Sequence, residues 1–535
     1  MKTIYITLIT ISAGFLSCVD LVEEPKAEIL ATGFFRNLSD LETANAGMYR
    51  RIINNANPWE VALTSTRFRA AFCAADDFTS RAGSNKADWL NADIFAFRVT
   101  PIAGRMGQNI WKIPWSGILQ ANWIINDGGA FLETLDAAST EEGQEIIAEA
   151  YFWRAWCYFY LVRMFGPVPI IQTNAYDPSV FLNIQSEHVE SVYNFIERDI
   201  QYAIDHARPA TVNDRQSRIT REAALAFMAE YALTRAGWPL KQTNYYQIAL
   251  DNANEVINGG KFTLFPSFYE LFDEVNEENS EYIWQLHFCV DGCIGTGGNV
   301  FGQKGSKPAE IGQGFADLFV EKTFGDNFPP GPRKDRSLVS TYKAELDGEV
   351  VDLTFSVDRP FFSKYWGTSY DSSALGSTQP RDAFSSLDWP MIRLAEVYMI
   401  AAEAQAMATG APSAQSYEYV NMIRRRGAGI DMNVAAPAVD LPAGLSAAQF
   451  QDEIFAERGW EFLGEMQRWF DLTRLEKVAE VTANRHPDEL TLANDAPTPG
   501  DGLSIGDPYY YLKPIQDIVL NPNLEKVNST ILTFE

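Results

Sequence analysis

Apolar residues recur at helical spacing along most of the chain, and the segments that carry them come in neighbouring pairs. The segment from Gln144 to Phe165 is apolar almost all round, which indicates a helix inside a helical assembly. Gly166 and Pro167 end it, because glycine caps a helix and proline cannot continue one. An amphipathic segment at 187–206 is expected to pack back against it. Other helices are expected at 34–57, Thr220 to Leu233, Tyr245 to Ile257, Ile392 to Ala404 and Ala414 to Arg425.

Alanines are frequent in the later pairs and allow two helices to approach closely. Their spacing with aromatic residues resembles a tetratricopeptide unit, although the full repeat consensus is absent. We therefore predict a mainly α fold, a tetratricopeptide-like scaffold of helical pairs at about 34–260 and 390–480. Such a scaffold is a curved α-solenoid rather than an α/β enzyme.

The pattern changes between the two parts of the scaffold, at about 262–390. Short β-like runs alternate there with glycine-rich loops, which predicts a loop-rich insertion with short strands. Strands are expected at Tyr282 to Phe288, Val351 to Val357 and Phe361 to Trp366. The C-terminal tail, 484–535, is expected to be extended, including Tyr511 to Ile515.

A ladder of carboxylates lies near the C-terminus, where residues 453–474 are predicted to form one helix. Glu453, Glu457, Glu461 and Glu465 recur every four residues and would lie on one stripe. Like charges at this spacing repel one another, so nearby positive charges must offset the repulsion. The ladder is therefore either a row of acid/base carboxylates or an ion-paired packing face. Three nearby arginines could supply the cations: Arg458, Arg468 and Arg474.

The hydrolase interpretation needs two carboxyl groups about 5–9.5 Å apart, and Glu457 and Glu461 meet that spacing on a helix. Adjacent arginines would however lower their pKa values, whereas a general acid needs a raised pKa. The chain also has no G-x-S-x-G motif and no phosphate-binding loop. We predict that the protein is not an enzyme, and we expect neither a cofactor nor a metal.

Composition narrows the class of ligand. The formal net charge of −27 argues against nucleic-acid binding, which needs basic patches. Aromatic residues make up 13% of the chain, enough for stacking surfaces as well as core. Sugars stack their apolar faces on such rings and bond their hydroxyls to polar side chains. The loop-like stretch at 58–108 and the insertion offer this mixture, and we predict ligand contacts from Asp77, Arg81, Asn85, Trp89, Phe301, Trp366 and Tyr370.

The N-terminus has the features of an export signal. Lys2 precedes an apolar run, Ile4 to Phe15, that is too short to span a bilayer. The run ends at Leu16-Ser17-Cys18, which resembles the lipobox of bacterial lipoproteins. We predict a signal peptide at 1–17, lipidation of Cys18 and a single domain at 18–535. The alternative is an ordinary signal peptide with a chance cysteine. The acidic residues after Cys18 are similar to the surface-export signal of Bacteroidetes lipoproteins.

The remaining cysteines leave two alternatives open. Cys157 lies in a very apolar helix and is expected to be a buried thiol. Cys289 and Cys293 flank a turn and could form a local disulfide, or bind a metal together with His287. We favour no metal, because no fourth ligand is evident.

Several motifs, in this order and spacing, resemble the SusD/RagB family of outer-membrane nutrient-binding lipoproteins over nearly the whole mature chain. They are Arg154-Ala155, Tyr158-Phe159, Leu161-Val162, Phe165-Gly166 and Val168-Pro169; Arg393 to Glu396 and Ala401 to Ala404; Asn421, Ile423-Arg424 and Arg426; Glu457-Arg458, Glu461-Phe462, Glu465, Arg468 to Leu472 and Arg474; Leu512 to Ile515, Ile518 and Asn521 to Leu524. The family more often has Pro where Leu512 or Lys513 stands and Gln near Lys526, which are minor departures.

The resemblance implies a tetratricopeptide-like helical fold, a lipid-anchored, surface-exposed position in the outer membrane, and a SusC-like TonB-dependent transporter as partner. It also implies capture of oligosaccharides for import. Two other classes stay open at this point: a surface lipoprotein glycoside hydrolase that uses paired carboxylates, and a helical-repeat module that binds protein or peptide.

Overall fold

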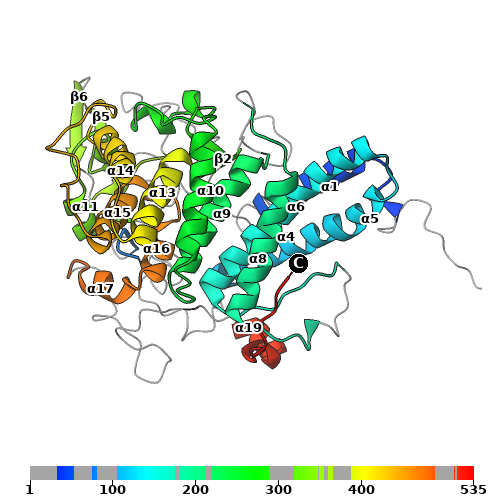
Figure 1. The fold of residues 1–535 in the computed structure, drawn as a ribbon. Coiled ribbons are helices and arrows are strands. Elements are labelled where there is room, and N and C mark those ends of the chain that lie inside the picture. Colours follow the sequence, from blue (N-terminus) through cyan, green and yellow to red (C-terminus); the bar gives the residue numbers. More distant parts are fainter. Residues whose placement is uncertain are drawn as a thin grey trace, which may run out of the picture.

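The structure is a computed structural model. It describes residues 33–53, 75–80, 105–174, 181–211, 218–287, 319–346, 349–354, 359–365, 387–487, 511 and 515–534. Figure 1 shows its helices side by side, with α1 and α4 to α6 at one end, α9 and α10 in the middle, and α13 to α16 at the other end. None of the described helices is both long enough and apolar enough to cross a membrane.

The N-terminal helices are built around α6. They are α1 (Leu38–Ile53), α4 (Arg105–Trp123), the π-helix η3 (Ile124–Gly128), α5 (Gly129–Leu132), α6 (Ala137–Phe165) and α8 (Val189–His206). Helix α6 packs against α1, α4 and α8, and most of its residues are buried, as its all-round apolar pattern predicted. It begins earlier than Gln144, because the Asp136 side chain accepts a hydrogen bond from Ser139 N and caps it there. It ends as predicted at Gly166, whose φ is 71°.

The predicted later pairs are also present. They are α9 (Arg221–Ala236) with α10 (Tyr245–Asn258), and α13 (Leu394–Thr409) with α14 (Ala414–Gly427); α15 (Ala447–Glu461) follows them. Helix α10 packs against both α9 and α13, so the two parts of the scaffold meet directly although the insertion separates them in sequence. Ala249 and Ala253 of α10 are fully buried, which permits this close approach.

Short antiparallel strand pairs lie within the insertion or join it to other parts of the chain. Strand β2 (Tyr282–Leu286) pairs with β8 (Trp389–Arg393), and β5 (Thr341–Leu346) pairs with β6 (Glu349–Thr354). Two further pairs are β1 (Phe78–Thr79) with β3 (Phe319–Val320) and β4 (Leu338–Val339) with β7 (Phe361–Phe362). Four short helices were not predicted: η4 (Glu270–Phe272), η5 (Glu274–Asn276), α11 (Lys322–Asn327) and α12 (Pro332–Ser337).

One predicted helix start is wrong. Ile392 and Arg393 belong to strand β8 because they pair with β2, and α13 begins at Leu394. Leu394 N donates to Glu281 O at 2.9 Å, which continues the strand contact to the first helical residue. Helical periodicity across 392–404 does not reveal a strand partner that lies over one hundred positions away.

The prediction of one helix over 453–474 is also wrong. Helix α15 ends at Glu461, a turn follows, and α16 (Arg468–Arg474) and α17 (Val478–Ala483) continue the chain. In the turn, Gly464 has φ 74° and Met466 has φ 68°, values incompatible with a right-handed helix. A Cβ at Gly464 would lie 2.3 Å from the Phe362 ring, so the insertion fixes the turn from outside.

The C-terminal tail lies along α8. Its described residues include two short helices rather than an entirely extended chain, α19 (Ile515–Leu520) and η9 (Pro522–Glu525). Ser186 forms an isolated parallel bridge with Val527, and Asn194 Nδ2 donates to Leu532 O at 2.8 Å. The Phe534 ring contacts Phe195 with a centroid distance of 5.1 Å. The end of the chain therefore closes over the first helical group.

Candidate functional site

The carboxylates of the ladder lie in different environments. The Glu453 side chain is 42% exposed, whereas those of Glu457, Glu461 and Glu465 are buried. Glu465 lies in the turn after α15 rather than on the helix. The ladder therefore contributes three buried negative charges to the interior, and each requires cations to offset its desolvation.

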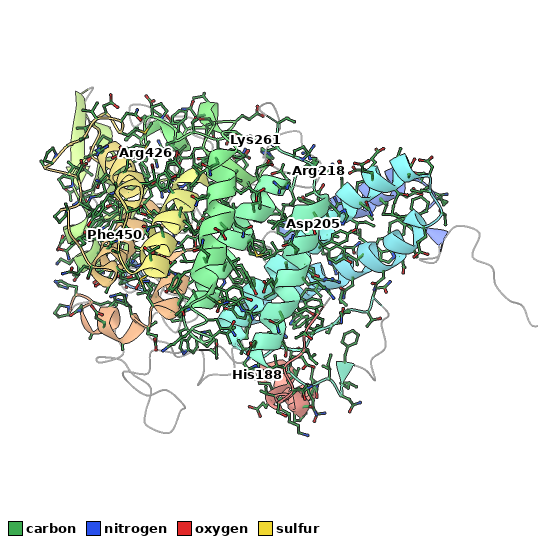
Figure 2. The ribbon with its side chains drawn as sticks, viewed as in Figure 1. His188, Asp205, Arg218, Lys261, Arg426 and Phe450 are labelled. Carbon is green, nitrogen blue, oxygen red and sulfur yellow. The ribbon has the colours of Figure 1, made fainter. Side chains whose placement is uncertain are left out.

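The buried carboxylates belong to a central ion cluster drawn from α15 and the turn after it, the insertion, β8 and α14. Its members are Glu281, Glu457, Glu461 and Glu465 with Arg333, Lys364, Arg393 and Arg426. These eight groups carry as many positive as negative charges, and Arg424 Nη1 adds a further cation at 3.1 Å from Glu457 Oε2. Arg426 is labelled in Figure 2, on α14 in the part of the molecule that also holds α13 and α15.

Glu461 lies at the centre of this cluster. Its Oε1 accepts from Arg393 Nη1 and Arg426 Nη2, both at 2.6 Å, and its Oε2 accepts from Arg333 Nη1 at 2.8 Å. Burial opposes ionisation of Glu461, but the charges of the three arginines outweigh it and hold the pKa of the carboxyl well below its usual value. Glu461 is therefore a permanent carboxylate.

Arg393 joins three carboxylates at once. It donates from Nε to Glu465 Oε2 at 2.8 Å and from Nη1 to Glu281 Oε1 at 2.9 Å, besides its bond to Glu461. Lys364 Nζ donates to Glu465 Oε1 at 2.6 Å and to the carbonyls of Glu461 and Leu463. These contacts fix the turn between α15 and α16, and burial lowers the pKa of Lys364 to about 8.

A second ion cluster lies on α16. Asp471 accepts from Arg458 Nε at 2.7 Å and from Arg474 Nε at 2.9 Å. Arg474 also donates to both carboxylate oxygens of Glu403, at 2.5 and 2.8 Å. This cluster holds α13, α15 and α16 together. The expectation that Arg458, Arg468 and Arg474 offset the ladder is wrong: their ion pairs among the described residues are with Asp471, Glu396, Asp76 and Glu403.

These contacts exclude acid/base work at the ladder. Glu457 and Glu461 share Arg333 Nη1 and are closed to solvent, so neither can exchange a proton with a substrate. A general acid also needs a raised pKa, whereas that of Glu461 is lowered. The ion-paired interpretation is confirmed.

Another group of residues forms what we call the loop junction: residues 75–80, 319–321, 360–362 and 485–486. Strand β1 pairs with β3, Val320 N donates to Pro360 O at 3.3 Å, and Glu321 N donates to Asp77 O at 2.9 Å. Arg485 Nη2 donates to Phe78 O at 3.3 Å. Figure 1 shows the short blue segment 75–80 among the orange helices rather than near α1.

Helix α16 anchors the loop junction to the scaffold. Arg468 donates from Nε and Nη2 to the two oxygens of Asp76, at 2.7 and 2.6 Å. Its Nη1 donates to Phe455 O at 2.8 Å, so one guanidinium connects α15, α16 and the junction. The Glu321 carboxylate accepts from Phe324 N and from His486 N, both at 2.7 Å. These bonds tie the junction to α11 and α16.

Of the predicted ligand contacts, only Asp77 lies within the described residues. It is 4% exposed and its Oδ1 has no hydrogen-bond partner, so its carboxylate does not lie on an open face. Arg81, Asn85 and Trp89 follow Ser80 of the junction, Phe301 precedes Phe319, and Trp366 and Tyr370 follow Tyr365, all outside the described residues. Residues close to these positions in sequence nevertheless meet at the loop junction, where 75–80, 319–321 and 360–362 are brought together, which the sequence alone did not show.

Other sequence features have structural roles or lie outside the described residues. Cys157 is a free, fully buried thiol, as expected, and Trp153, Trp156 and Trp469 are buried core residues. His287 Nδ1 contacts Asp388, while Cys18, Cys289 and Cys293 lie outside the described residues. The described part of the chain holds no group of three or more potential metal ligands.

Two family models match different parts of the chain. One, described as "SusD family", matches residues 364–529, and the other, "Starch-binding associating with outer membrane", matches residues 47–233. The first includes Arg393, Arg426 and the ladder, and the second includes α6 and α8.

Related proteins and structures resemble the chain over nearly its full length. SusD-like proteins P25 and P2 of Formosa agariphila are 25% and 28% identical; the matches cover 96% and 90% of this chain and 96% and 92% of theirs. A SusD homologue from Bacteroides thetaiotaomicron superposes with a TM-score of 0.73 at 20% identity, over 94% of this chain and 99% of its own.

Two further solved structures concern carbohydrate binders. One, with a bound xylogluco-oligosaccharide, superposes with a TM-score of 0.69 at 20% identity, over 92% of this chain and 99% of its own. The other, a laminarin-binding SusD-like protein, gives 0.67 at 21% identity, also over 92% of this chain and 99% of its own. These structures have the same mainly helical fold with few strands. Fold, family models and relatives agree, and the chain resembles SusD/RagB family proteins over nearly its full length.

Proposed function

We propose that this protein binds oligosaccharides at the cell surface and passes them to a TonB-dependent outer-membrane transporter. The observation that carries the proposal is the pair of family matches, one of them described as starch-binding and associated with the outer membrane. It is supported by two solved relatives of the same fold, one with a bound xylogluco-oligosaccharide and one that binds laminarin.

The ligand-binding face, in this proposal, is formed by the stretches that leave the loop junction. Trp89, Trp366, Phe301 and Tyr370 supply rings for stacking, and Arg81 and Asn85 supply donors and acceptors for sugar hydroxyls. The junction supports this arrangement because it ties the starts of these stretches to α16 through the Arg468–Asp76 pair. Asp77 has a buried carboxylate, so in this proposal it supports the loop junction rather than contacting the sugar.

We further propose that residues 1–17 are a signal peptide and that residues 18–535 form one domain tethered to the outer membrane by lipid on Cys18. A SusC-like transporter is the proposed partner. The buried, paired carboxylates of the ladder speak against the alternative of a glycoside hydrolase.

Calorimetric titration against a panel of oligosaccharides tests the proposal, with starch, xyloglucan and laminarin fragments included. Saturable binding without product formation is the expected result. Turnover of a bound glycan that is abolished by Glu457→Gln in a folded protein would favour the hydrolase. Capture of peptides with no saturable glycan binding would favour the peptide-binding module.

Aromatic variants locate the site. Trp89→Ala and Trp366→Ala should each lower glycan affinity tenfold or more, about 1.4 kcal/mol, because each removes a stacking ring. The matched control is Tyr269→Ala, an aromatic residue that is 45% exposed, immediately precedes η4 and has Arg336 over its ring. Unchanged affinity in both Trp variants would place the site elsewhere.

A further inference from the structure

The loop junction contains a buried carboxyl group, that of Asp77, one of whose oxygens has no hydrogen-bond partner. That oxygen is Oδ1, and it is closed to solvent. A buried, ionised oxygen without a partner is costly, so the closed junction favours the protonated carboxyl. The backbone carbonyl of the same residue accepts from Glu321 N, so Asp77 lies directly at the contact between the first and second junction segments.

The charged groups around Asp77 come from each segment that packs there. On its own segment, Asp76 adds a neighbouring negative charge. From α16, Arg468 is attractive, but its Nε and Nη2 are bonded to Asp76 and its Nη1 to Phe455 O. From the chain after α17, Arg485 donates to Phe78 O. From the end of β3, the carboxylate of Glu321 accepts from two backbone amides.

We propose that the loop junction is a pH-sensitive latch, in which the β1–β3 pair stays closed while Asp77 is protonated and loosens when it ionises. Ionisation places an unpaired charge beside Asp76, and the charge is relieved when the junction opens and water reaches Asp77. The proposal goes beyond glycan binding, because it concerns the described junction itself.

The direction of the effect follows from the two states of Asp77. Burial, followed by the charge of Asp76, raises the pKa of Asp77 to about 7 in the closed junction, from 3.8 for the ordinary carboxyl. The higher pKa belongs to the closed state, so protonation stabilises closure fully below pH 3.8, and this contribution is lost as the pH rises through about 7. Opening should therefore increase by up to about tenfold per pH unit within that window and level off above it.

Hydrogen exchange of the full chain, measured without glycan, tests this directly. The readout is the protection factor, relative to the intrinsic exchange rate, of peptides that contain Phe78–Thr79 and Phe319–Glu321. We expect protection in the wild type to fall from pH 5 to 7 and then to level off, whereas Asp77→Asn should show no such fall. The proposal is overturned if the protection factors of the wild type do not change with pH, a result that needs no variant. It is also overturned if the protection factors of Asp77→Asn fall with pH as in the wild type.

The matched control is Glu277→Gln. Glu277 is another partly buried carboxyl whose pKa is raised to about 7, by burial and then by Asp388, but it bonds Asp388 N beside the β2–β8 pair. Its substitution should leave the pH dependence at the junction as in the wild type. If it abolishes that dependence, the latch is not at Asp77. Glycan affinity could also be measured against pH, but that result would depend on the proposed glycan-binding function. The exchange measurement is made without glycan and does not depend on it.

Discussion

Glu461 and Arg393 show how charged residues are accommodated inside this helical protein. Each is fully surrounded, and Arg393 donates to Glu281, Glu461 and Glu465. A buried ion pair contributes little relative to an apolar pair of the same volume, but removal of one partner leaves an uncompensated charge. The cluster therefore makes the packing specific, and its members depend on one another.

Arg393→Met tests this dependence. The substitution keeps much of the side-chain volume and removes the bonds to three carboxylates, so the free energy of unfolding should fall by about 3–5 kcal/mol. Chemical denaturation followed by circular dichroism measures the change. Arg36→Met is the control, because the Arg36 side chain is 64% exposed and pairs with Asp40 at the surface; the denaturation midpoint should stay almost unchanged. A small loss in Arg393→Met, similar to the control, would contradict a cooperative cluster.

The lowered pKa of Glu461 predicts a pH-dependent stability. Because its folded pKa lies below the ordinary 4.5, the ionised carboxylate stabilises the fold above pH 4.5, and that contribution is lost as the pH falls. The stability difference between wild type and Glu461→Gln should therefore be largest near neutral pH and narrow below about pH 4.5. Denaturation midpoints measured from pH 7 to pH 3 give the comparison. If the stability difference between wild type and Glu461→Gln stays constant over that range, the ionised form of Glu461 is not what its contacts with the arginines stabilise.

At this scale the sequence predicted the type of interaction but not its partners. The repeated glutamates required cations, and nearby arginines were available. The cations that bond Glu461 are instead Arg333, Arg393 and Arg426, which come from other elements. Only the three-dimensional arrangement of α12, β8 and α14 brings them together, so spacing along the ladder could not identify them.

The turn between α15 and α16 shows how elements far apart in sequence determine one another. Gly464 is held at φ 74° with the Phe362 ring 2.3 Å from the place of a Cβ. Gly464→Ala should lower the free energy of unfolding by about 2–5 kcal/mol, from left-handed strain together with a steric clash. Thermal and chemical denaturation provide the measurement.

Gly410→Ala separates those two causes. Gly410 ends α13 with φ 85°, but a Cβ added there would meet nothing within 4 Å, so only strain of about 1–2 kcal/mol is expected. Combining Gly464→Ala with Phe362→Leu should recover part of the loss by relieving the clash. Equal losses at Gly464 and Gly410, with no recovery in the double variant, would rule out the Phe362 contact as the cause of the turn.

Most long helices could be predicted, because burial of one face imposes a period that the sequence displays. Helix α6 and the pairs α9–α10 and α13–α14 are of this kind. The errors arose where a distant element overrides the local pattern: β2 makes a strand of Ile392 and Arg393, and Phe362 interrupts the helix after Glu461. Tertiary contacts decide such positions, and periodicity alone carries no information about them.

For the whole molecule, the ion clusters hold the helices of the scaffold together, and the loop junction holds the stretches that are proposed to bind glycan. Residue types predicted which stretches are suited to bind sugar, but their meeting point depends on the pairing of β1 with β3, whose register joins Phe78 to Val320 and Thr79 to Phe319 across a long separation in sequence. The Arg468–Asp76 pair then ties that point to the helices. The stretches proposed to bind glycan leave the helical scaffold at this junction, and loops held on such a scaffold commonly carry ligand contacts.

The proposed membrane tether is a property of the whole chain, and Cys18→Ala tests it. With lipid on Cys18, the wild type should fractionate with outer membranes, since several acyl chains make a stable anchor. An ordinary signal peptide is cleaved off and would leave the protein without a membrane anchor. Cys18→Ala should abolish acyl labelling and release the protein from that fraction. Cys289→Ser, which removes a cysteine far from the N-terminus, should change neither. Membrane retention of Cys18→Ala would contradict a lipid tether, and a wild type that is itself released would favour an ordinary signal peptide.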